Sequence, residues 1–482
     1  MLRNAELQKQ KRSRSEAEAK QAGDCRLAYQ REQGALAKLA DRPRATRSYP
    51  IVFEPLSALG DQLAKLRKVG RCVVVSNDIV GPLYAEKVLA SLERAGWKPE
   101  YVELRDGEEN KTAETYLGLV NKLLDLQVDR KTPVIAVGGG VTTDIVGFAA
   151  ATTLRGLPFA NVPTTLLAQV DASVGGKTGV NTTHGKNLLG AFWQPFLVHV
   201  AVETLASLSD AEFRCGLGEV IKHAVLEETP DPSDAAKLVP STEFMEWLEA
   251  NSGPLTKREP QALSHTIRRC CEIKAGVVSA DETESGKRAL LNLGHTVGHA
   301  IEAVVGFGGL RHGEAVAMGT IAETQLAVIR GACSDSGLPD RIANLTRALG
   351  LPTGLADLDL DALETASYAD KKREDAVISV TLPFAIGDVR LVKIAPSDLR
   401  PAFERLSLNA VACSPSKSDQ ATFQGAAQKP LSQQPPAPAP PSSSSNSFAS
   451  NSNPNSGNFV VDGRTTTRVR QPPGGASSIT FG

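Results

Sequence analysis

The stretch Thr132-Pro-Val-Ile-Ala-Val-Gly-Gly-Gly140 decides the fold class of this chain. Its apolar, β-branched residues predict a buried strand that runs directly into three glycines, and an apolar helix follows from Asp144. A glycine cluster between a strand and a helix lets backbone N–H groups approach a phosphate at the positive helix end. The spacing Gly-Gly-Gly-x-x-x-Asp is not the dinucleotide motif G-x-G-x-x-G, so by itself it fits a nucleotide-binding turn and a tight structural turn equally well.

The residues upstream show the same alternation of strand and helix signals. A second β-branched run covers residues 71–76, and helical periodicity covers 83–95 and 112–126. Strands that alternate with helices predict a parallel sheet with helices packed against it. We therefore expect an α/β domain over residues 46–205.

The strand signals fade after Pro195, and the rest of the folded chain is predicted to be mainly helical. Ser209 is a candidate cap for the first of these helices, and one late strand is expected at 376–384. Helical periodicity is found at 213–227, 268–278, 313–329 and 339–349. These signals predict a second, mainly α-helical domain over residues 206–408.

The composition is that of a soluble protein, because 41% of the 482 residues are hydrophobic and 22% are charged. A net charge of −1 gives no long-range attraction to nucleic acid or to an anionic membrane. No stretch approaches the ~18 apolar residues of a membrane-spanning helix. The seven cysteines are odd in number and lack a C-x-x-C pair, which indicates reduced thiols inside a cell. The N-terminus has no apolar signal core, and we expect a cytoplasmic or plastid location.

Both ends of the chain differ in composition from the part between them. Residues 1–45 are highly charged and predict a partly helical or disordered extension that could bind a partner. Residues 409–482 are rich in Ser, Pro, Gln, Asn and Ala, which predicts a disordered tail. The last part, 455–482, resembles the tail motif of small plant and animal microtubule-associated proteins, and this resemblance implies a cytoskeletal partner.

Three of the seven histidines lie close together in the sequence. His295 and His299 are four residues apart and project from one face of a helix, and His312 follows a glycine-rich loop that could bring it back beside them. Zn²⁺ in catalytic sites has three protein ligands, often imidazoles, with one position open. Thr296 stands where a zinc peptidase carries its glutamate base, so the spacing predicts a metal site without peptidase activity. The alternative is that these histidines are satisfied by hydrogen bonds at helix ends or in the core.

The run Gly175-Gly-Lys177-Thr is similar to part of a P-loop, but we reject that reading. Asp171 stands where the P-loop requires a glycine, and its charge would repel a triphosphate. What remains is a segment loosened by glycines that brings Lys177, Lys186 and Asn187 within reach of an anion. The alternative is that these side chains are simply solvated.

Glu219, Lys222 and His223 lie three and four residues apart on the helix that follows Ser209. Such a trio is more often a surface ion pair than a site. Glycines at 216 and 218 weaken the start of this helix, which indicates that another part of the chain packs closely against its backbone there.

Ordered segments between residues 47 and 403 closely resemble the 3-dehydroquinate synthase family of sugar phosphate cyclases. The segments are 106–109, 138–141, 152–159, 162–171, 173–179, 185–192, 218–222 and 291–302. The resemblance implies an NAD-binding α/β domain and a helical domain, with NAD and Zn²⁺ (or Co²⁺) in the cleft between them. It also implies a homodimer that closes 3-deoxy-D-arabino-heptulosonate 7-phosphate to 3-dehydroquinate with loss of phosphate, a step of the shikimate pathway of aromatic amino acid biosynthesis.

The resemblance also implies roles for individual residues. The metal ligands would be Glu219, His295 and His312. Catalytic residues near the reacting carbons, the substrate carboxylate and the ring hydroxyls would be Asp171, Lys222, Lys274, Arg288, Asn292 and His299. The phosphate would be bound by Arg155, Lys177, Asn187 and one of Lys371 or Lys372, with His299 also on that side. NAD would be contacted by Asn77, Glu108, Lys111, Gly139, Gly140, Asp144, Thr164, Thr165, Lys186 and Ser207.

Two other functions stay open at this point. Related cyclases close sedoheptulose 7-phosphate or glucose 6-phosphate, and those branches replace the residues at positions 292 and 371. Without a substrate carboxylate, Lys274 and Arg288 would lack a counter-charge, and a buried unpaired charge is costly. The presence of these cations with Asn292 and Lys371 therefore favours the dehydroquinate reaction. The other alternative is an interaction protein whose cyclase domain is tethered by the tail.

Two residues depart from the pattern of the family. Thr143 stands where glycine is usual beside the pyrophosphate, so the turn must accommodate a side chain. Asn77 replaces a commonly acidic residue near the adenosine ribose, which is expected to weaken NAD binding.

Overall fold

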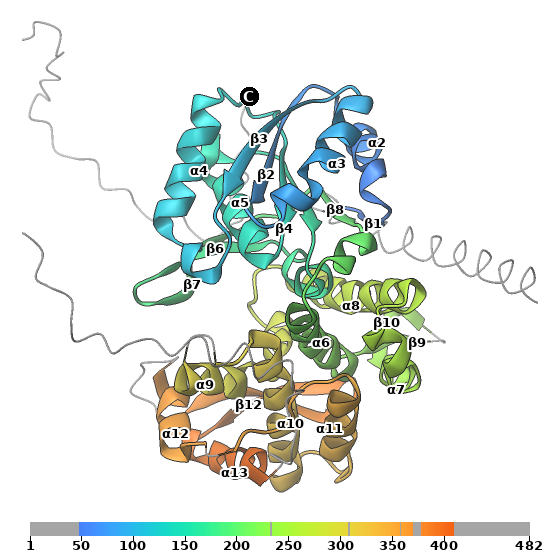
Figure 1. The fold of residues 1–482 in the computed structure, drawn as a ribbon. Coiled ribbons are helices and arrows are strands. Elements are labelled where there is room, and N and C mark those ends of the chain that lie inside the picture. The colour runs from blue at the N-terminus through green and yellow to red at the C-terminus, as the bar shows by residue number, and fades with distance from the viewer. Residues whose placement is uncertain (1–47, 232–233, 307–308, 357, 370–376, 409–482) are drawn as a thin grey trace, which may run out of the picture. The chain divides into compact units, whose positions relative to one another are not determined.

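The structure is a computed structural model that describes residues 48–231, 234–306, 309–356, 358–369 and 377–408 (Figure 1). The extension 1–45, the tail 409–482 and the two lysines at 371 and 372 lie outside these ranges, so what the sequence predicts for them stays a prediction. None of the helices in the described ranges combines the length and the apolar character that a bilayer-spanning segment requires.

A six-stranded sheet dominates the first half of the chain. Its strand order is β1-β8-β5-β4-β2-β3, and every neighbouring pair is parallel. The strands are β1 (Ile51–Phe53), β2 (Arg71–Asn77), β3 (Lys98–Leu104), β4 (Val134–Gly138), β5 (Phe159–Pro163) and β8 (Leu197–Val200). The strand predicted at 132–137 is β4, and all of its residues are buried. The expected α/β fold with a parallel sheet is confirmed.

Helices cover both faces of this sheet (Figure 1), and the side chains of β2 pack against both layers. Val73 and Val75 pack in one core cluster with α4 (Ala113–Asp125) and α5 (Gly140–Thr152). Cys72 and Val74 point the other way and pack with α2 (Leu59–Leu66) and α3 (Gly81–Arg94). Successive side chains of a strand face opposite sides, so a strand covered on both faces must be continuously apolar.

Strands also lie where the sequence analysis expected none. β8 begins at Leu197, just past the point where the strand signals fade, and pairs with β1 and β5, so the prediction of a helical chain from there on was wrong for this segment. Its residues form too short a run to show periodicity. β6 (Lys177–Thr182) and β7 (Gly185–Phe192) form an antiparallel hairpin in the segment that we predicted to be loosened by glycines. A Cβ on Gly190 would lie 2.2 Å from the carbonyl oxygen of Thr178, so this glycine permits close strand contact rather than looseness.

The second half is mainly helical, as predicted, with two additional hairpins. The late strand predicted at 376–384 is β11, which pairs with β12. The Ser209 hydroxyl accepts the N–H of Glu212 and caps the first helix, as predicted. The elements are α6 (Asp210–Val225), β9 (Glu228–Asp231), β10 (Asp234–Pro240), α7 (Glu243–Thr256), α8 (Pro260–Ala280), α9 (His295–Val305), α10 (His312–Ile329), α11 (Leu338–Ala348), α12 (Leu360–Ala369), β11 (Ile378–Ala385), β12 (Asp388–Ile394) and α13 (Arg400–Leu408).

Helices α6 and α10 meet at glycines. A Cβ on Gly218 would lie 1.9 Å from the carbonyl oxygen of Gly313, and a Cβ on Gly313 would lie 1.7 Å from that of Cys215. The close backbone contact that the glycines at 216 and 218 predicted is therefore present. It places Glu219 of α6 beside His312, the first residue of α10.

Candidate active site

Two imidazoles and one carboxylate converge where α6, α9 and α10 meet. Glu219 Oε1 lies 3.7 Å from His295 Nε2 and 3.3 Å from His312 Nε2. One nitrogen or oxygen atom of each residue lies within 4.8 Å of those of the other two. A carboxylate with two imidazoles is a donor set of catalytic zinc sites.

The second nitrogen of each imidazole faces a hydrogen-bond acceptor. His295 Nδ1 lies 3.0 Å from the carbonyl oxygen of Leu293, and His312 Nδ1 lies 3.2 Å from Glu302 Oε2. A proton on each Nδ1 would leave Nε2, on the side of the ring that faces Glu219, with a lone pair for a metal ion. Both rings are thus oriented with Nε2 toward Glu219. Glu302 also belongs to a second group that could hold a metal ion, together with His299 and His312.

The first turn of α9 is capped by a residue of α10. Its N-cap, Gly294, has no side chain, and Glu323 accepts the N–H groups of Gly294 at 2.6 Å and Val297 at 3.2 Å. Burial raises the pKa of Glu323 to about 8, although these amides lower it. The capped turn carries His295 and His299, whose ring centroids are 5.4 Å apart, as expected for positions four apart on a helix.

A buried cluster of charges adjoins the two imidazoles and the carboxylate. Lys222 Nζ lies 2.5 Å from Glu219 Oε2 and 2.7 Å from Asp171 Oδ2. Lys274 forms an ion pair with the other oxygen of Asp171 and donates a hydrogen bond to its backbone carbonyl at 2.8 Å. Asp171 belongs to the π-helical turn η4 (Ala168–Ala172), which packs against α6 and α8. Residues of both halves of the chain therefore build one charge network.

The charges of this cluster stabilise one another in a site shielded from water. Burial would raise the pKa of Asp171, but the ammonium groups of Lys222 and Lys274 hold it well below its usual range. Burial alone would lower the pKa of Lys222, and the carboxylates of Asp171 and Glu219 raise it instead. The side chains of Glu219, Lys222 and His223 are at most 2% exposed, so they do not form the surface ion pair that their spacing more often indicates.

Arg288 and Asn292 lie on the 3₁₀ turn η6 (Lys287–Asn292) that precedes α9. The Arg288 guanidinium is buried and donates to the carbonyl oxygens of Glu282 and Gly175. The expectation that Lys274 lacks a counter-charge without substrate needs correction, because Asp171 pairs with it. Arg288 donates to carbonyl oxygens, which carry no full charge. The Arg288 Nε atom is buried and has no hydrogen-bond partner among the described residues.

The residues predicted to bind phosphate are only partly brought together. Lys177 Nζ lies 2.7 Å from Glu284 Oε2, and Asn187 Oδ1 accepts a hydrogen bond from Lys111 Nζ at 2.6 Å. Arg155 is exposed at the end of α5 with a φ of 64°. Within the described ranges, no hydrogen bond or ion pair joins Arg155 to another predicted site residue.

Several residues predicted to contact NAD lie at the carboxyl edge of the sheet, where open α/β folds bind ligands. Gly139 follows β4 and is the N-cap of α5, which begins at Gly140. Lys111 Nζ lies 2.6 Å from Asp144 Oδ2, and burial raises the pKa of Asp144 despite this partner. The hydroxyl of Thr164, after β5, is buried and has no hydrogen-bond partner in the part of the chain that the structure describes.

The two departures from the family pattern are both accommodated. The Thr143 hydroxyl donates back to the carbonyl oxygen of Gly140 at 3.0 Å, and the side chain is buried. The Asn77 amide donates to Asp106 Oδ1 at 2.6 Å, and its oxygen accepts the N–H groups of Ile79 and Val80. Asn77 therefore organises the turn after β2.

The remaining predicted cofactor residues each have a partner within the protein. Glu108 Oε1 accepts a hydrogen bond from Asn181 at 2.7 Å, and Thr165 Oγ1 accepts the N–H of Ala168 at 3.2 Å. The Ser207 hydroxyl lies 2.6 Å from that of Tyr84. Lys186 Nζ lies 3.3 Å from Glu302 Oε1.

Two carboxylates that the sequence analysis missed connect predicted site residues. Glu302 joins Lys186 to His312, and its position three residues after His299 on one helix was a usable signal. Glu284 joins Lys177 to Asn292, whose Nδ2 atom lies 3.4 Å from Glu284 Oε1. Glu284 lies between α8 and η6 with a φ of 61°, where no periodicity could have indicated it.

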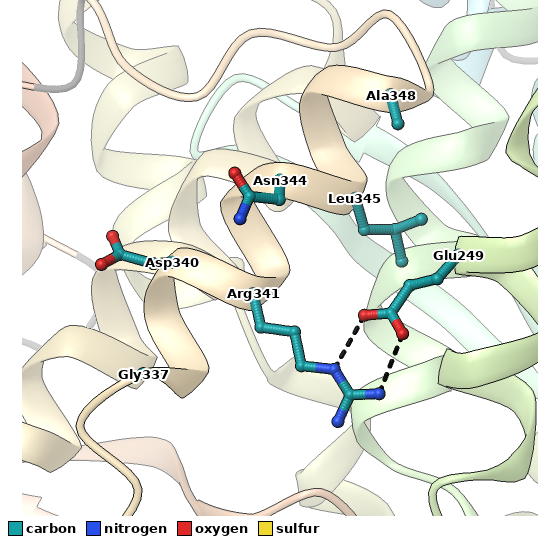
Figure 2. Close-up of a pocket in the computed structure, with 7 residues that line it drawn as sticks. All are labelled: Glu249, Gly337, Asp340, Arg341, Asn344, Leu345 and Ala348. Carbon is teal, nitrogen blue, oxygen red and sulfur yellow. Dashed lines mark hydrogen bonds and ion pairs between the residues drawn. The ribbon is translucent and has the colours of Figure 1, made fainter.

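A separate pocket lies between α7 and α11, away from the residues described above. It has a volume of about 460 Å³ and is lined by Glu249, Gly337, Asp340, Arg341, Asn344, Leu345 and Ala348 (Figure 2). Arg341 and Glu249 form two parallel hydrogen bonds across it, at 2.7 and 2.9 Å. It shares no lining residue with the predicted site.

The fold matches those of solved enzymes. A 2-epi-5-epi-valiolone synthase from Streptomyces hygroscopicus subsp. jinggangensis, solved with NAD⁺ and Zn²⁺ bound, matches with a TM-score of 0.66 and 29% identity over 75% of this chain and 97% of that one. A 2-deoxy-scyllo-inosose synthase has the same TM-score with 24% identity over 75% and 97%, which supports the fold alone. Fold and site together define a sugar phosphate cyclase.

Sequence comparison identifies the family within this class. The profiles "3-dehydroquinate synthase N-terminal" and "3-dehydroquinate synthase C-terminal" match residues 101–215 and 216–373. The 3-dehydroquinate synthase of Pelobacter propionicus is 43% identical over 73% of this chain and 95% of its own length, and that of Geobacter metallireducens is 45% identical over 74% and 94%. The chain belongs to the 3-dehydroquinate synthase family.

Proposed function

We propose that the chain is an active 3-dehydroquinate synthase, a carbon–oxygen lyase that depends on NAD and a divalent metal. It closes 3-deoxy-D-arabino-heptulosonate 7-phosphate to 3-dehydroquinate and releases phosphate. The observation that carries the proposal is the convergence of Glu219, His295 and His312 beside the buried cluster of Asp171, Lys222 and Lys274. Membership of the family supports the choice of reaction.

The residues present fit a divalent metal. Glu219, His295 and His312 offer one carboxylate oxygen and two Nε2 atoms, and acceptors at both Nδ1 atoms favour the tautomer that binds a metal. We propose Zn²⁺, with Co²⁺ as a functional substitute, because both are found in solved cyclases of this fold.

The carboxyl edge of the sheet fits a dinucleotide. Gly139 and Gly140 expose the first backbone N–H groups of α5, which favour a pyrophosphate at the positive helix end. The unpartnered Thr164 hydroxyl at the same edge offers a further hydrogen bond. We propose that these residues bind NAD together with Asn77, Glu108, Lys111, Asp144, Thr165, Lys186 and Ser207.

When bound, NAD would supply the capacity for hydride transfer, and Zn²⁺ would supply Lewis acidity toward the hydroxyls of the substrate. The protein orients the substrate for both. Asp171 holds the ammonium groups of Lys222 and Lys274 side by side, so that these cations can donate hydrogen bonds to substrate oxygens next to the reacting carbons.

The two ends of the substrate are both anionic, and cations are available for each. Lys274, the free Nε–H of Arg288 and the amide of Asn292 can bind the carboxylate and ring hydroxyls. Arg155, Lys177, Asn187 and one of Lys371 or Lys372 would neutralise the phosphate as it leaves. His299, on the same helix face as His295, is placed to hold or move a proton beside them.

Phosphate release with defined substrates tests this proposal. The purified chain is incubated with NAD and Zn²⁺ and either 3-deoxy-D-arabino-heptulosonate 7-phosphate or sedoheptulose 7-phosphate, and inorganic phosphate is measured. We expect turnover of the seven-carbon acid alone. Turnover of sedoheptulose 7-phosphate with none of the acid would show instead a cyclase of the related branch.

Three further features are proposed from the family resemblance and composition. We expect a homodimer, which light scattering measures, and a cytoplasmic or plastid location, which a fluorescent fusion shows. Binding of the tail 409–482 to microtubules would be measured by co-sedimentation, and absence of pelleting would rule out a cytoskeletal partner.

A further inference from the structure

Glu302 lies at the centre of an unbroken series of polar contacts through the site. Its Oε2 atom lies 3.2 Å from His312 Nδ1, and its Oε1 atom lies 3.3 Å from Lys186 Nζ. On the far side of the ring, His312 Nε2 lies 3.3 Å from Glu219 Oε1. The series therefore runs from a lysine of the β6–β7 hairpin, through Glu302 and His312, to the carboxylate of α6.

The two contacts of Glu302 hold its carboxylate in one orientation. Each oxygen has its own partner, one on α10 and one on β7, so rotation of the carboxylate would break both contacts. Only 16% of the side chain is exposed, which limits the competition from water. Glu302 also follows His295 by seven residues and His299 by three, so α9 presents all three side chains toward His312.

The orientation of the His312 ring depends on this carboxylate. His312 is the first residue of α10, and only about a third of its side chain is exposed. A carboxylate at Nδ1 fixes the proton there, makes Nε2 the free lone pair and raises the basicity of the ring. Glu219 cannot do this, because it approaches the other nitrogen.

We propose that Glu302 is a positioning residue that sets the tautomer and orientation of His312 for metal binding. The inference rests on the proposed function, and it assigns Glu302 a role through His312 rather than as a metal ligand. Lys186 contributes by holding the second oxygen of the carboxylate.

Zinc affinity of Glu302 variants tests the proposal. Glu302→Gln keeps an oxygen that can accept from Nδ1 but removes the charge, and Glu302→Ala removes both. Apparent zinc dissociation constants, measured by titration in a chelator-buffered solution, are expected to rise about 10-fold for the first and about 100-fold for the second. The visible absorption of the Co²⁺-substituted protein is expected to change, and saturating Zn²⁺ is expected to restore turnover of Glu302→Gln.

The matched control is Glu249→Gln, which makes the same chemical change at the exposed ion pair of the pocket between α7 and α11 (Figure 2). It should keep the zinc affinity and Co²⁺ spectrum of the parent chain. If the parent chain binds zinc and turns over substrate, and both Glu302 variants bind zinc as tightly, the role of Glu302 is wrong. If the parent chain binds no zinc, the proposed function itself fails, and the inference fails with it.

Discussion

Two ion-pair systems in this molecule differ in their access to water. Arg341 and Glu249 form a bidentate pair in which each side chain is about one-third exposed, at 33% and 35% (Figure 2). Lys222, only 2% exposed, lies between the carboxylates of Asp171 and Glu219. Water and salt screen the first pair, whereas they screen the buried charges much less.

The difference in burial supports the proposal that the buried cluster serves catalysis. Burying charges costs free energy, and well-packed apolar side chains are often equally or more stabilising than a buried ion pair. A chain selected for stability alone would gain little from Asp171, Lys222, Lys274 and Glu219 in one place. These charges do, however, form a preoriented polar site, in which transition-state charge is stabilised without reorganisation.

The largest effect is expected from removing an imidazole beside the buried cluster. His295→Ala deletes one of three proposed ligands, so we expect loss of bound zinc. We also expect turnover to fall at least about 1000-fold, because each ~1.4 kcal/mol of lost transition-state stabilisation lowers the rate tenfold. Metal analysis and phosphate release measure the two losses. His265→Ala is the control, because His265 stacks on Trp247 outside the site. A His295→Ala variant with full zinc content and turnover would refute the ligand assignment.

Removing the central cation is expected to affect stability most. Lys222→Met leaves the carboxylates of Asp171 and Glu219 near each other without the ammonium between them. Breaking a buried pair by removing one partner costs about 3–5 kcal/mol, so we expect a loss of this size in the free energy of unfolding measured in urea. A loss below about 1 kcal/mol in the free energy of unfolding would mean that the buried ion pairs of Lys222 contribute no more to stability than an exposed pair.

Glu323 is a buried carboxylate whose pKa shifts in the direction opposite to that of Asp171. The pKa of Glu323 is raised from 4.5 to about 8 by burial, so the folded state binds this proton more tightly than the unfolded state. Its contribution to stability is complete below about pH 4.5 and is lost as the pH rises through 8.

Glu323→Gln cannot ionise and should remove this pH dependence. The difference in unfolding free energy between the parent chain and the variant is expected to fall by at least about 1.4 kcal/mol from pH 5 to pH 9, because that is the equivalent of one pKa unit. Urea unfolding at fixed ionic strength measures it. A difference that is constant over this range would show that Glu323 ionises normally in the folded protein.

The parts of the fold that the sequence predicted are those with strong local signals. β2 and β4 are continuous β-branched runs because helices cover both faces of the sheet. The β6–β7 hairpin was missed because glycines and polar residues interrupt its alternation. Gly179 and Gly190 face each other across it, and glycine in a strand is usually read as a break rather than as close contact.

From local sequence patterns alone, the candidate site was predictable only where its residues are near in sequence. His295 and His299 share a helix face by spacing alone. The burial of Glu219 and Lys222 depends on the contact of Gly218 with Gly313, which lies 95 residues further along the chain. The pairing of Lys274 with Asp171 joins positions 103 apart. Family resemblance indicated these residues, whereas periodicity carries no information on such distant contacts.

The smallest effect is expected at the exposed pair. Glu249→Gln removes one charge from a partner that remains in water, so we expect a loss of at most about 1 kcal/mol in the free energy of unfolding, with no change in turnover. Salt sharpens this test: at 1 M ionic strength the Debye length falls to about 3 Å, and the difference from the parent chain should disappear. A loss above about 2 kcal/mol in the free energy of unfolding that persists in high salt would show that the bidentate geometry matters more than exposure to water. The difference between this pair and Lys222 would then depend on geometry and not on burial.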